Sequence, residues 1–282
     1  MGGENGAVKD WDDEFANSAY IEGAEAYPDR WALKAQAFRD KMVDAERAEL
    51  DVVYGDTPRE KFDLFLPKDG PKGLTVFVHG GYWMAFDKSY WSHLACGAAE
   101  SGWAMCLPSY TLAPDASLGE MTVQIARAIS VAAASVSGPI CLSGHSAGGH
   151  LVTRMVCRGA SLDKDIQTRI KRVVSISGLH DLRNLRHTKM NEMLKLSEQD
   201  AIAESAALQD PIESADVTCW VGGDERPEFV YQAKALNEAW GSSKVNLHVE
   251  NGRHHFDIID DLAKPNSVLC AVLTGAPRSD YS

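Results

Sequence analysis

Ser146 lies in a five-residue pattern that is typical of a catalytic serine. The pattern, Gly144-His145-Ser146-Ala147-Gly148, follows an apolar run at 140–142 and precedes a stretch that favours a helix. Sequences of the form G-x-S-x-G place the serine on a sharp strand-to-helix turn, where the two glycines avoid clashes with neighbouring elements. The amide of Ala147, at the start of the helix, can donate to a developing oxyanion. A glycine-rich turn with an incidental serine is the alternative interpretation.

A pair of glycines, Gly80 and Gly81, comes directly after the apolar run Leu74–Val78. Because glycine lacks a Cβ, these backbone amides can approach a substrate oxygen closely. We therefore predict an oxyanion hole made of Gly80, Gly81 and Ala147. Tyr82 and Trp83 follow, and we expect them to bind substrate and to narrow the acyl side, which favours a formyl or acetyl group. A simple turn followed by two core aromatic residues is the alternative.

A serine hydroxyl is a poor nucleophile unless a base takes its proton, so a catalytic Ser146 requires a histidine. In chains with this kind of turn, the expected order is serine, acid, histidine. Two adjacent histidines, His254 and His255, follow the apolar run Val245–Val249. We predict His255 as the base, because it directly precedes Phe256 and a helix predicted over 257–262. His254 is the alternative.

The acid that orients the histidine is expected between the serine and the histidine. Asp224 and Glu225 follow two glycines and the apolar run Val217–Val221. The G-x-x-D/E spacing from Gly222 favours Glu225, and Asp224 is the alternative. A further possibility is that this acidic pair belongs only to a solvated loop.

Short runs rich in apolar and β-branched residues predict the strands that position these residues. They lie at Leu50–Val53, Phe62–Leu66, Leu74–Val78, Ala104–Leu107, Ile140–Leu142, Val173–Ile176, Val217–Val221 and Val245–Val249. The first two alternate with charged residues and suit an antiparallel pair, whereas the later ones are almost wholly apolar and suit buried parallel strands. We therefore predict a mostly parallel, eight-stranded sheet.

Stretches long enough for helices separate the later strands, at Ser89–Glu100, Gly119–Ala134, Ala147–Arg158 and Glu228–Ala239. Strand-helix alternation of this kind predicts an α/β fold with helices on both faces of the sheet. Within the third stretch one apolar stripe faces the sheet; it is formed by Leu151, Val152, Met155 and Val156. We find no repeat or linker, so residues 1–282 are predicted to form a single domain.

Two segments interrupt the alternation of strands and helices. Residues 1 to about 48 include a predicted helix after Pro28, whose apolar face is formed by Trp31, Ala35, Phe38 and Met42. Residues 182–215 are polar and favour helices. We expect both segments to contribute to a small helical cap across the carboxyl edge of the sheet.

Composition argues against several classes of function. The 28 Lys and Arg against 40 Asp and Glu give a formal charge of −12, and no basic run could bind a phosphate backbone, so no nucleic-acid partner is expected. The six cysteines show no C-x-x-C spacing, and no histidine spacing or nucleotide motif predicts a metal or cofactor. Without a signal peptide or an apolar run near the roughly 20 residues of a membrane span, we expect a cytoplasmic protein with no membrane contact.

At these motifs the chain resembles the esterases of the α/β-hydrolase fold, and among them the serine-type arylformamidases, also called kynurenine formamidases. The resemblance covers roughly residues 25–265. It rests on His79-Gly80-Gly81-Tyr82-Trp83, Gly148-Gly149-His150, Ser177-Gly178-Leu179-His180-Asp181-Leu182, Glu225-Arg226-Pro227-Glu228-Phe229 and His255-Phe256. In that family the triad acid lies two residues before the Pro-Glu-Phe segment, a position held here by Glu225.

The resemblance implies hydrolysis of N-formylkynurenine or a related aryl formamide, with activity on small aryl esters. A general carboxylesterase or thioesterase acting on another short acyl group is the alternative within the same fold. A ligand-binding protein that keeps the scaffold without chemistry is a third hypothesis. Such proteins usually lack a triad residue, whereas Ser146, Glu225 and His255 are all present. The sequence therefore favours an enzyme that acts on a small-molecule acyl substrate.

Overall fold

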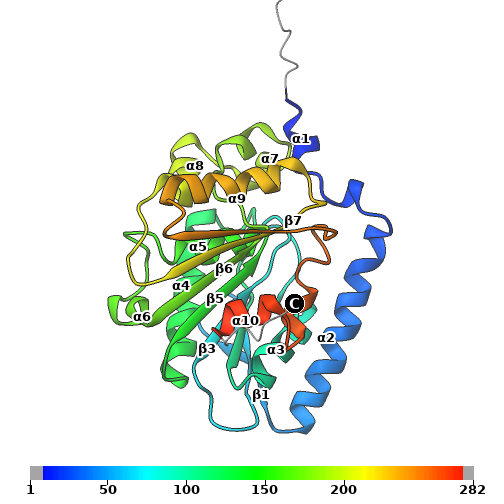
Figure 1. The fold of residues 1–282 in the computed structure, drawn as a ribbon, viewed down its shortest axis with the longest axis vertical. Helices are drawn as coiled ribbons and strands as arrows, with labels where there is room; N and C mark the ends of the chain where they lie inside the picture. Colours follow the sequence, from blue (N-terminus) through cyan, green and yellow to red (C-terminus); the bar gives the residue numbers. More distant parts are fainter. Residues whose placement is uncertain (1–8, 276–282) are drawn as a thin grey trace, which may run out of the picture.

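A computed structural model describes residues 9–275 of the chain (Figure 1). Within this range eight strands form one sheet in the order β1-β2-β4-β3-β5-β6-β7-β8. The strands are β1 (Ala48–Val53), β2 (Lys61–Phe65), β3 (Leu74–Val78), β4 (Ala104–Pro108), β5 (Ile140–His145), β6 (Ile170–Ile176), β7 (Asp216–Gly222) and β8 (Val245–Glu250). β1 and β2 pair antiparallel, as does β2 with β4, and every other pairing is parallel. The prediction of a mostly parallel, eight-stranded α/β sheet is confirmed.

Helices cover both faces of the sheet and one of its ends (Figure 1). The α-helices are α1 (Trp11–Glu14), α2 (Tyr27–Asp44), α3 (Ala95–Glu100), α4 (Leu118–Ser135), α5 (Ala147–Arg154), α6 (Lys164–Arg169), α7 (Asn191–Leu194), α8 (Glu198–Glu204), α9 (Pro227–Trp240) and α10 (Val268–Thr274). Short 3-10 helices are η1 (Ser18–Tyr20), η2 (Ala24–Ala26), η3 (Lys88–Tyr90), η4 (Ser92–Leu94), η5 (Arg183–His187), η6 (Ala206–Leu208) and η7 (Asp260–Ala263).

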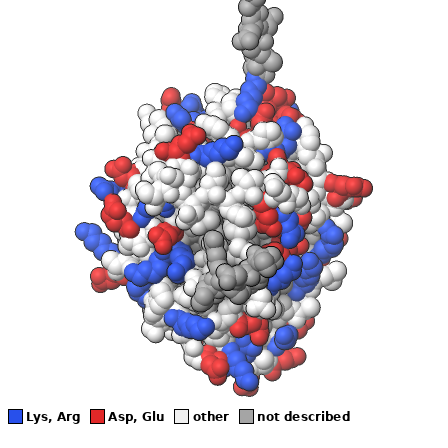
Figure 2. Space-filling model, in the orientation of Figure 1, with Lys and Arg blue, Asp and Glu red and all other residues white. Residues whose placement is uncertain are grey.

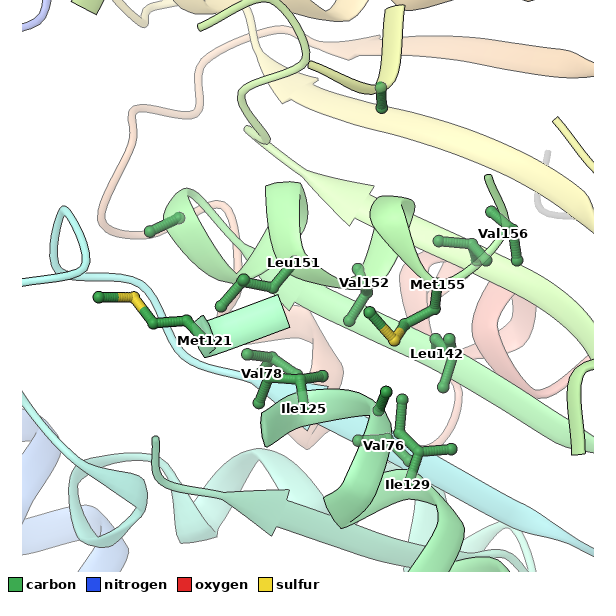
Figure 3. Packing of buried hydrophobic residues seen from close by; sticks show 14 of the residues in the cluster. Val76, Val78, Met121, Ile125, Ile129, Leu142, Leu151, Val152, Met155 and Val156 are labelled. Atoms are coloured by element: carbon green, nitrogen blue, oxygen red, sulfur yellow. The ribbon is translucent and has the colours of Figure 1, made fainter. Parts of the chain in front are cut away.

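Alternation of side chains along the central strands builds two apolar cores, one on each face of the sheet. In β3, Val76 and Val78 join the core under α4, α5 and α9, whereas Phe77 between them joins the core under α2, α3 and α10. Figure 3 shows part of the first core, in which side chains of β3, β5, α4 and α5 pack together. The stripe predicted for α5 is buried there; its members are Leu151, Val152, Met155 and Val156.

Three helix predictions are wrong in part. The helix expected over Ala147–Arg158 ends at Arg154, as α5. The stretch Ser89–Glu100 forms η3, η4 and α3 instead of one helix. Arg39 donates to the Ser89 carbonyl oxygen and to the Ser92 hydroxyl, which removes an acceptor from a continuous helix. The range 257–262 forms turns that lead into η7. There the amide of Asp257 donates to His254 Nδ1, and the amide of His254 donates to Asp257 Oδ1.

Only part of the first segment expected to form a cap lies beside the second segment, residues 182–215. α1 lies beside α7 at the end of the molecule that also carries α8 (Figure 1), and the amide of Lys189 donates to Asp12 Oδ1 over 2.7 Å. α2 packs instead on one face of the sheet, against η3 and η4. The four residues predicted to form its apolar face are buried; they are Trp31, Ala35, Phe38 and Met42.

Charges of both signs are interspersed on the face of the molecule drawn in Figure 2. Among residues 9–275, no helix is both long enough and apolar enough to cross a bilayer. The segment Met1–Gly6, on which the expectation of no signal peptide rests, lies outside the described residues.

Candidate active site

Ser146 lies at the tip of the turn between β5 and α5. Its backbone has φ 55° and ψ −118°, and its amide donates to the Ile176 carbonyl oxygen of β6 over 2.8 Å. A Cβ at Gly148 would overlap the carbonyl oxygen of Val78 in β3, so only glycine lets α5 pass this close to the sheet. A positive φ is strained for a residue other than glycine and persists only where the surroundings enforce it. The turn therefore has the geometry that the G-x-S-x-G pattern predicts.

A short hydrogen bond joins the imidazole of His255 to the carboxylate of Glu225. His255 lies in the loop after β8 and Glu225 in the loop after β7, and both residues are buried. The distance from His255 Nδ1 to Glu225 Oε2 is 2.5 Å. Because an ionised carboxylate only accepts hydrogen bonds, Nδ1 carries the proton and Nε2 has a free lone pair. This is the tautomer that a general base requires.

The two alternatives considered for the acid and the base lie apart from this pair. His254 Nε2 contacts the Tyr27 hydroxyl at 3.0 Å, and His254 Nδ1 accepts from the amides of Phe256 and Asp257. The side chain of Asp224 is exposed. Of the four candidates, Glu225 and His255 are therefore the two that form a pair.

Glu225 accepts two further hydrogen bonds on its other oxygen. The Gly222 amide donates to Oε1 over 2.8 Å and the Ser177 hydroxyl donates to the same atom over 2.5 Å. Ser177 is buried at the end of β6 and has φ 49°. Three donors thus fix the orientation of the carboxylate. Sequence reasoning assigned Ser177 no role, although it follows a predicted strand and begins one of the segments on which the family resemblance rests.

His145, the residue before the predicted nucleophile, packs against His255. The centroids of the two rings are 4.6 Å apart, and His145 Nε2 lies 2.8 Å from the backbone carbonyl oxygen of His255. A carbonyl oxygen only accepts, so Nε2 of His145 carries a proton. Burial, followed by the nearby His255, lowers the pKa of His145 well below its usual value. This contact was also missed, because the second position of G-x-S-x-G accepts many residue types.

The predicted oxyanion loop lies against the serine turn. A Cβ at Gly80 would lie 3.0 Å from the Ser146 Cβ and 2.8 Å from the His145 carbonyl oxygen. Gly81 has φ 107°, which a residue with a side chain rarely adopts. No backbone hydrogen bond within residues 9–275 uses the amides of Gly80 or Gly81, and Ala147 is the first residue of α5, where amides lack an intrahelical acceptor. Within the described residues these three amides thus have no backbone acceptor, and two of them, those of Gly80 and Ala147, belong to residues that adjoin Ser146.

The two aromatic residues predicted to bind substrate lie in the same loop. The Tyr82 hydroxyl donates to the Phe15 carbonyl oxygen over 2.5 Å and accepts from Asn17 Nδ2 over 2.9 Å. Trp83 is fully buried, and its ring packs edge-on against His150 with centroids 5.3 Å apart. A role of Tyr82 and Trp83 in narrowing the acyl side stays a prediction.

One contact expected of a serine-histidine pair is absent from the described residues. Among residues 9–275, no hydrogen bond links the Ser146 hydroxyl to the His255 imidazole. His145 is their common neighbour, since it precedes Ser146 in the chain and its ring contacts that of His255. In free enzymes such hydroxyl-imidazole bonds are often long and tighten only when substrate binds.

Other polar groups near the turn are uncharged. Burial lowers the pKa of His79 to about 4, and its ring stacks on Tyr110 with centroids 4.6 Å apart. In the part of the chain that the structure describes, no group of three or more His, Cys, Asp or Glu side chains could hold a metal ion. The polar groups beside Ser146 are therefore amides, imidazoles and one carboxylate, a set suited to acyl transfer.

The chain resembles a family model and several known proteins in sequence. The family model described as BD-FAE matches residues 62–237. A kynurenine formamidase from Danio rerio is 32% identical over 86% of this chain and 85% of its own length, and a kynurenine formamidase from Salmo salar is 30% identical over 76% of each chain.

Solved structures also resemble the chain. A crystal structure from Silicibacter sp. TM1040, provisionally described as a thioesterase, is 51% identical, covers 95% of this chain and 100% of its own, and has a TM-score of 0.91. An esterase from Pyrobaculum calidifontis shares the fold at 17% identity and a TM-score of 0.64, over 89% of this chain and 93% of its own. The chain therefore belongs to the BD-FAE family of α/β-hydrolase esterases, in which it resembles the kynurenine formamidases.

Proposed function

We propose that the protein is a serine hydrolase that removes a small acyl group from an aryl formamide, such as N-formylkynurenine, or from an aryl ester. Ser146 is the nucleophile, His255 the general base and Glu225 the acid that orients it. The reaction passes through an acyl-enzyme on Ser146. The observation that carries the proposal is the hydrogen bond between Glu225 and His255 beside the strained serine turn.

In the first half of the reaction, Ser146 Oγ attacks the substrate carbonyl carbon while His255 Nε2 takes the hydroxyl proton. The carbonyl oxygen becomes an oxyanion and accepts from the amides of the oxyanion hole, namely Gly80, Gly81 and Ala147. His255 then gives the proton to the leaving nitrogen or oxygen. The bond from the carbonyl carbon to this atom breaks, and an aniline or phenol departs.

In the second half, a water molecule attacks the ester carbonyl of the acyl-enzyme and His255 Nε2 takes a proton from the water. The same three amides stabilise the second oxyanion. His255 then returns the proton to Ser146 Oγ as the ester bond breaks, which releases formate or another small acid. The negative charge of Glu225 stabilises the imidazolium that forms in both halves.

A thioesterase or general carboxylesterase is the second candidate. The observation in its favour is the 51% identity with the Silicibacter structure that is provisionally described as a thioesterase. The kynurenine formamidases are less similar in sequence, at 25–32% identity, but three of them match most of their own length. The same triad and oxyanion hole would serve either substrate, so the substrate distinguishes the two candidates.

A hydrolysis screen tests both candidates. N-formylkynurenine, the formyl, acetyl and butyryl esters of one phenol, and short acyl thioesters are compared by kcat/KM. We expect the formamide and the formyl ester to be the best substrates, with kcat/KM falling as the acyl chain lengthens. Faster turnover of thioesters would favour the second candidate, and equal or rising kcat/KM with chain length would contradict a narrow acyl side.

The serine mechanism has a separate test. Ser146→Ala should lower kcat by at least about a thousandfold while the fold stays intact, since loss of one triad member removes most of the catalysis. A fluorophosphonate should label the wild-type protein at Ser146 and leave Ser146→Ala unlabelled. Absence of labelling in the wild type would favour a ligand-binding protein instead.

A further inference from the structure

Residues 9–17, which we call the strap, contact two parts of the candidate active site that lie far apart in the sequence. The strap includes α1 and lies at the end of the molecule that carries α7 and α8 (Figure 1). It contacts the oxyanion loop on one side and the start of α9 on the other. Because Glu225 lies two residues before α9, the strap borders both the oxyanion loop and the acid-base pair.

The contact with the oxyanion loop is made through Tyr82, the residue after Gly81. Its hydroxyl donates to the carbonyl oxygen of Phe15 and accepts from the side-chain amide of Asn17, at 2.5 and 2.9 Å. Burial raises the pKa of Tyr82 to about 12, so the hydroxyl keeps its proton at neutral pH. Tyr82 has φ 53°, a conformation that a tyrosine holds only under constraint. The two bonds from the strap supply such a constraint.

The contact with the acid-base pair runs through aromatic rings. Phe15 is buried and meets Phe229 of α9 edge-on, with centroids 6.2 Å apart. The Phe229 ring in turn lies against His255, with centroids 4.5 Å apart. Phe15 and His255 therefore both contact the Phe229 ring, and because the interior is closely packed, a change at Phe15 can reach the imidazole through this ring.

Charges anchor the strap at its other positions. Lys9 Nζ lies 2.8 Å from the buried Glu228 Oε2, and Arg226 Nη2 lies 2.5 Å from Asp13 Oδ2. A buried carboxylate without a partner is costly, so Glu228 favours the docked strap. Partial burial opposes protonation of Lys9, but the hydrogen bond and charge of Glu228 outweigh it and raise the pKa of Lys9.

We propose that the strap is a positioning element of the active site. Through Phe15 and Asn17 it holds Tyr82, and with it the amides of Gly80 and Gly81, at the distance that the oxyanion requires. Through Phe15 it also supports Phe229, whose ring contacts His255. This inference rests on the proposed function, because it assigns the strap a role in the same reaction.

The test compares full-length variants with 4-nitrophenyl acetate as the probe. Tyr82→Phe keeps the ring and removes the hydroxyl, and Asn17→Ala removes the donor on the strap. Asn17→Ala should lower kcat by about three- to tenfold with little change in KM, the size expected for loss of one hydrogen bond, and Tyr82→Phe, which loses two, by at least as much. The double variant should match Tyr82→Phe alone, since that change already removes the contact with Asn17.

The matched control is Tyr54→Phe, which does not contact the strap. It also loses a phenol hydrogen bond, from its hydroxyl to the Ser109 carbonyl oxygen at 2.5 Å, and its side chain is buried. We expect its kcat to equal that of the wild type. Melting temperatures of all variants separate positioning from stability, because a purely structural strap would lower Tm and leave kcat unchanged at a temperature where every variant is folded.

Phe15→Leu gives a second readout that does not depend on Tyr82. We expect slower labelling of Ser146 by a fluorophosphonate, about three- to tenfold, because the Phe229 ring, which contacts the base, loses its support. Wild-type kcat in Tyr82→Phe, or additive effects in the double variant, would overturn the inference. If the wild-type protein neither hydrolyses the probe nor is labelled, the proposed function fails; if it does both and the variants match it, only the role of the strap fails.

Discussion

At the scale of single residues, the carboxylate of Glu225 depends on partners from two loops. His255, Ser177 and the Gly222 amide all donate to it. Two of these donors make no contact with a substrate, so their effect on the reaction passes through the orientation of the imidazole. Removing one of them changes the base without removing any group that the proposed mechanism uses directly.

Ser177→Ala should therefore lower kcat/KM by about tenfold or more. A hydrogen bond to a charged group contributes about 1.5–3 kcal/mol, and its loss lets the carboxylate turn away from His255. Steady-state kinetics with an aryl ester measure the effect. Ser175→Ala is the control, because Ser175 is also a buried serine of β6 but contacts His180 instead of Glu225. Equal losses in the two variants would contradict the assigned role.

His145 is a further contact of the proposed base: its Nε2 donates to the backbone carbonyl oxygen of His255. His145→Gln keeps a side-chain donor, whereas His145→Leu keeps only volume. We expect Leu to lower kcat by about tenfold and Gln by less, since a lost hydrogen bond leaves the carbonyl oxygen unpaired in a buried site. Single-turnover kinetics distinguish slower acylation from slower release. If the two variants lose activity equally, the hydrogen bond is not what positions His255.

At the scale of elements, the side chain of Glu204 connects α8 to α4 and α5 by hydrogen bonds. Glu204 Oε2, at the end of α8, accepts from Thr122 of α4 over 2.8 Å and from Arg154 of α5 over 3.1 Å. The backbone carbonyl oxygen of Glu204 also contacts His150 Nε2 of α5 at 2.9 Å. Since α5 begins directly after Ser146, this junction fixes α8 relative to the serine turn.

Glu204→Ala should lower the free energy of unfolding by about 3 kcal/mol, because it leaves the partly buried Arg154 without its carboxylate. Urea denaturation measures this change. Glu198→Ala on the same helix is the control: Glu198 is exposed and 4.0 Å from Arg186, so its loss should change stability by less than about 0.5 kcal/mol. Similar values for the two variants would contradict the role of the junction.

The strands could be predicted from the sequence because each is a short run that is apolar on the faces it buries. The same reasoning gave the buried face of α2, whose apolar residues recur at helical spacing. It failed at Ser89–Glu100, where Arg39 of a distant helix takes the Ser89 carbonyl oxygen. Local patterns cannot reveal a competitor that is 50 residues away.

The site was predictable where glycine spacing and strand ends marked it, as for Ser146 and the loops of Glu225 and His255. The parts of the site in which tertiary contacts strain the backbone could not be predicted. Within residues 9–275, five of the eight non-glycine residues with positive φ follow β3, β5 or β6; they are Tyr82, Trp83, Phe86, Ser146 and Ser177. Only Ser146 belongs to a pattern that signals such strain. Strained residues gather at functional sites, but their sequence need not show it.

At the scale of the whole molecule, several histidines are buried in the neutral state. Burial is the largest cause in each case, and it lowers the pKa of His79, His93 and His150 to about 4 and that of His180 to about 3. In the unfolded chain the same groups titrate near about 6.5. As pH falls from about 6.5 to 4, the unfolded state therefore binds protons that the folded state does not bind.

We accordingly predict acid destabilisation that begins near pH 6.5. Each of these histidines lowers the free energy of unfolding by about 1.4 kcal/mol per pH unit below its unfolded pKa, until its folded pKa is reached. Urea midpoints between pH 7.5 and 4.5 measure the slope. His180→Gln should make the slope shallower by about one proton, because it removes one buried neutral imidazole. An unchanged slope in His180→Gln would contradict the prediction.

The anchor between Lys9 and Glu228 spans 219 positions of the chain. On the ribosome, the strap is synthesised before Tyr82, before Phe229 and before the strand that precedes Glu225. The contacts of the strap with Glu228 and Phe229 can form only after residue 229 has been made, long after the strap and Tyr82. A nascent chain that already contains the serine turn therefore still lacks half of the contacts that hold the strap in place.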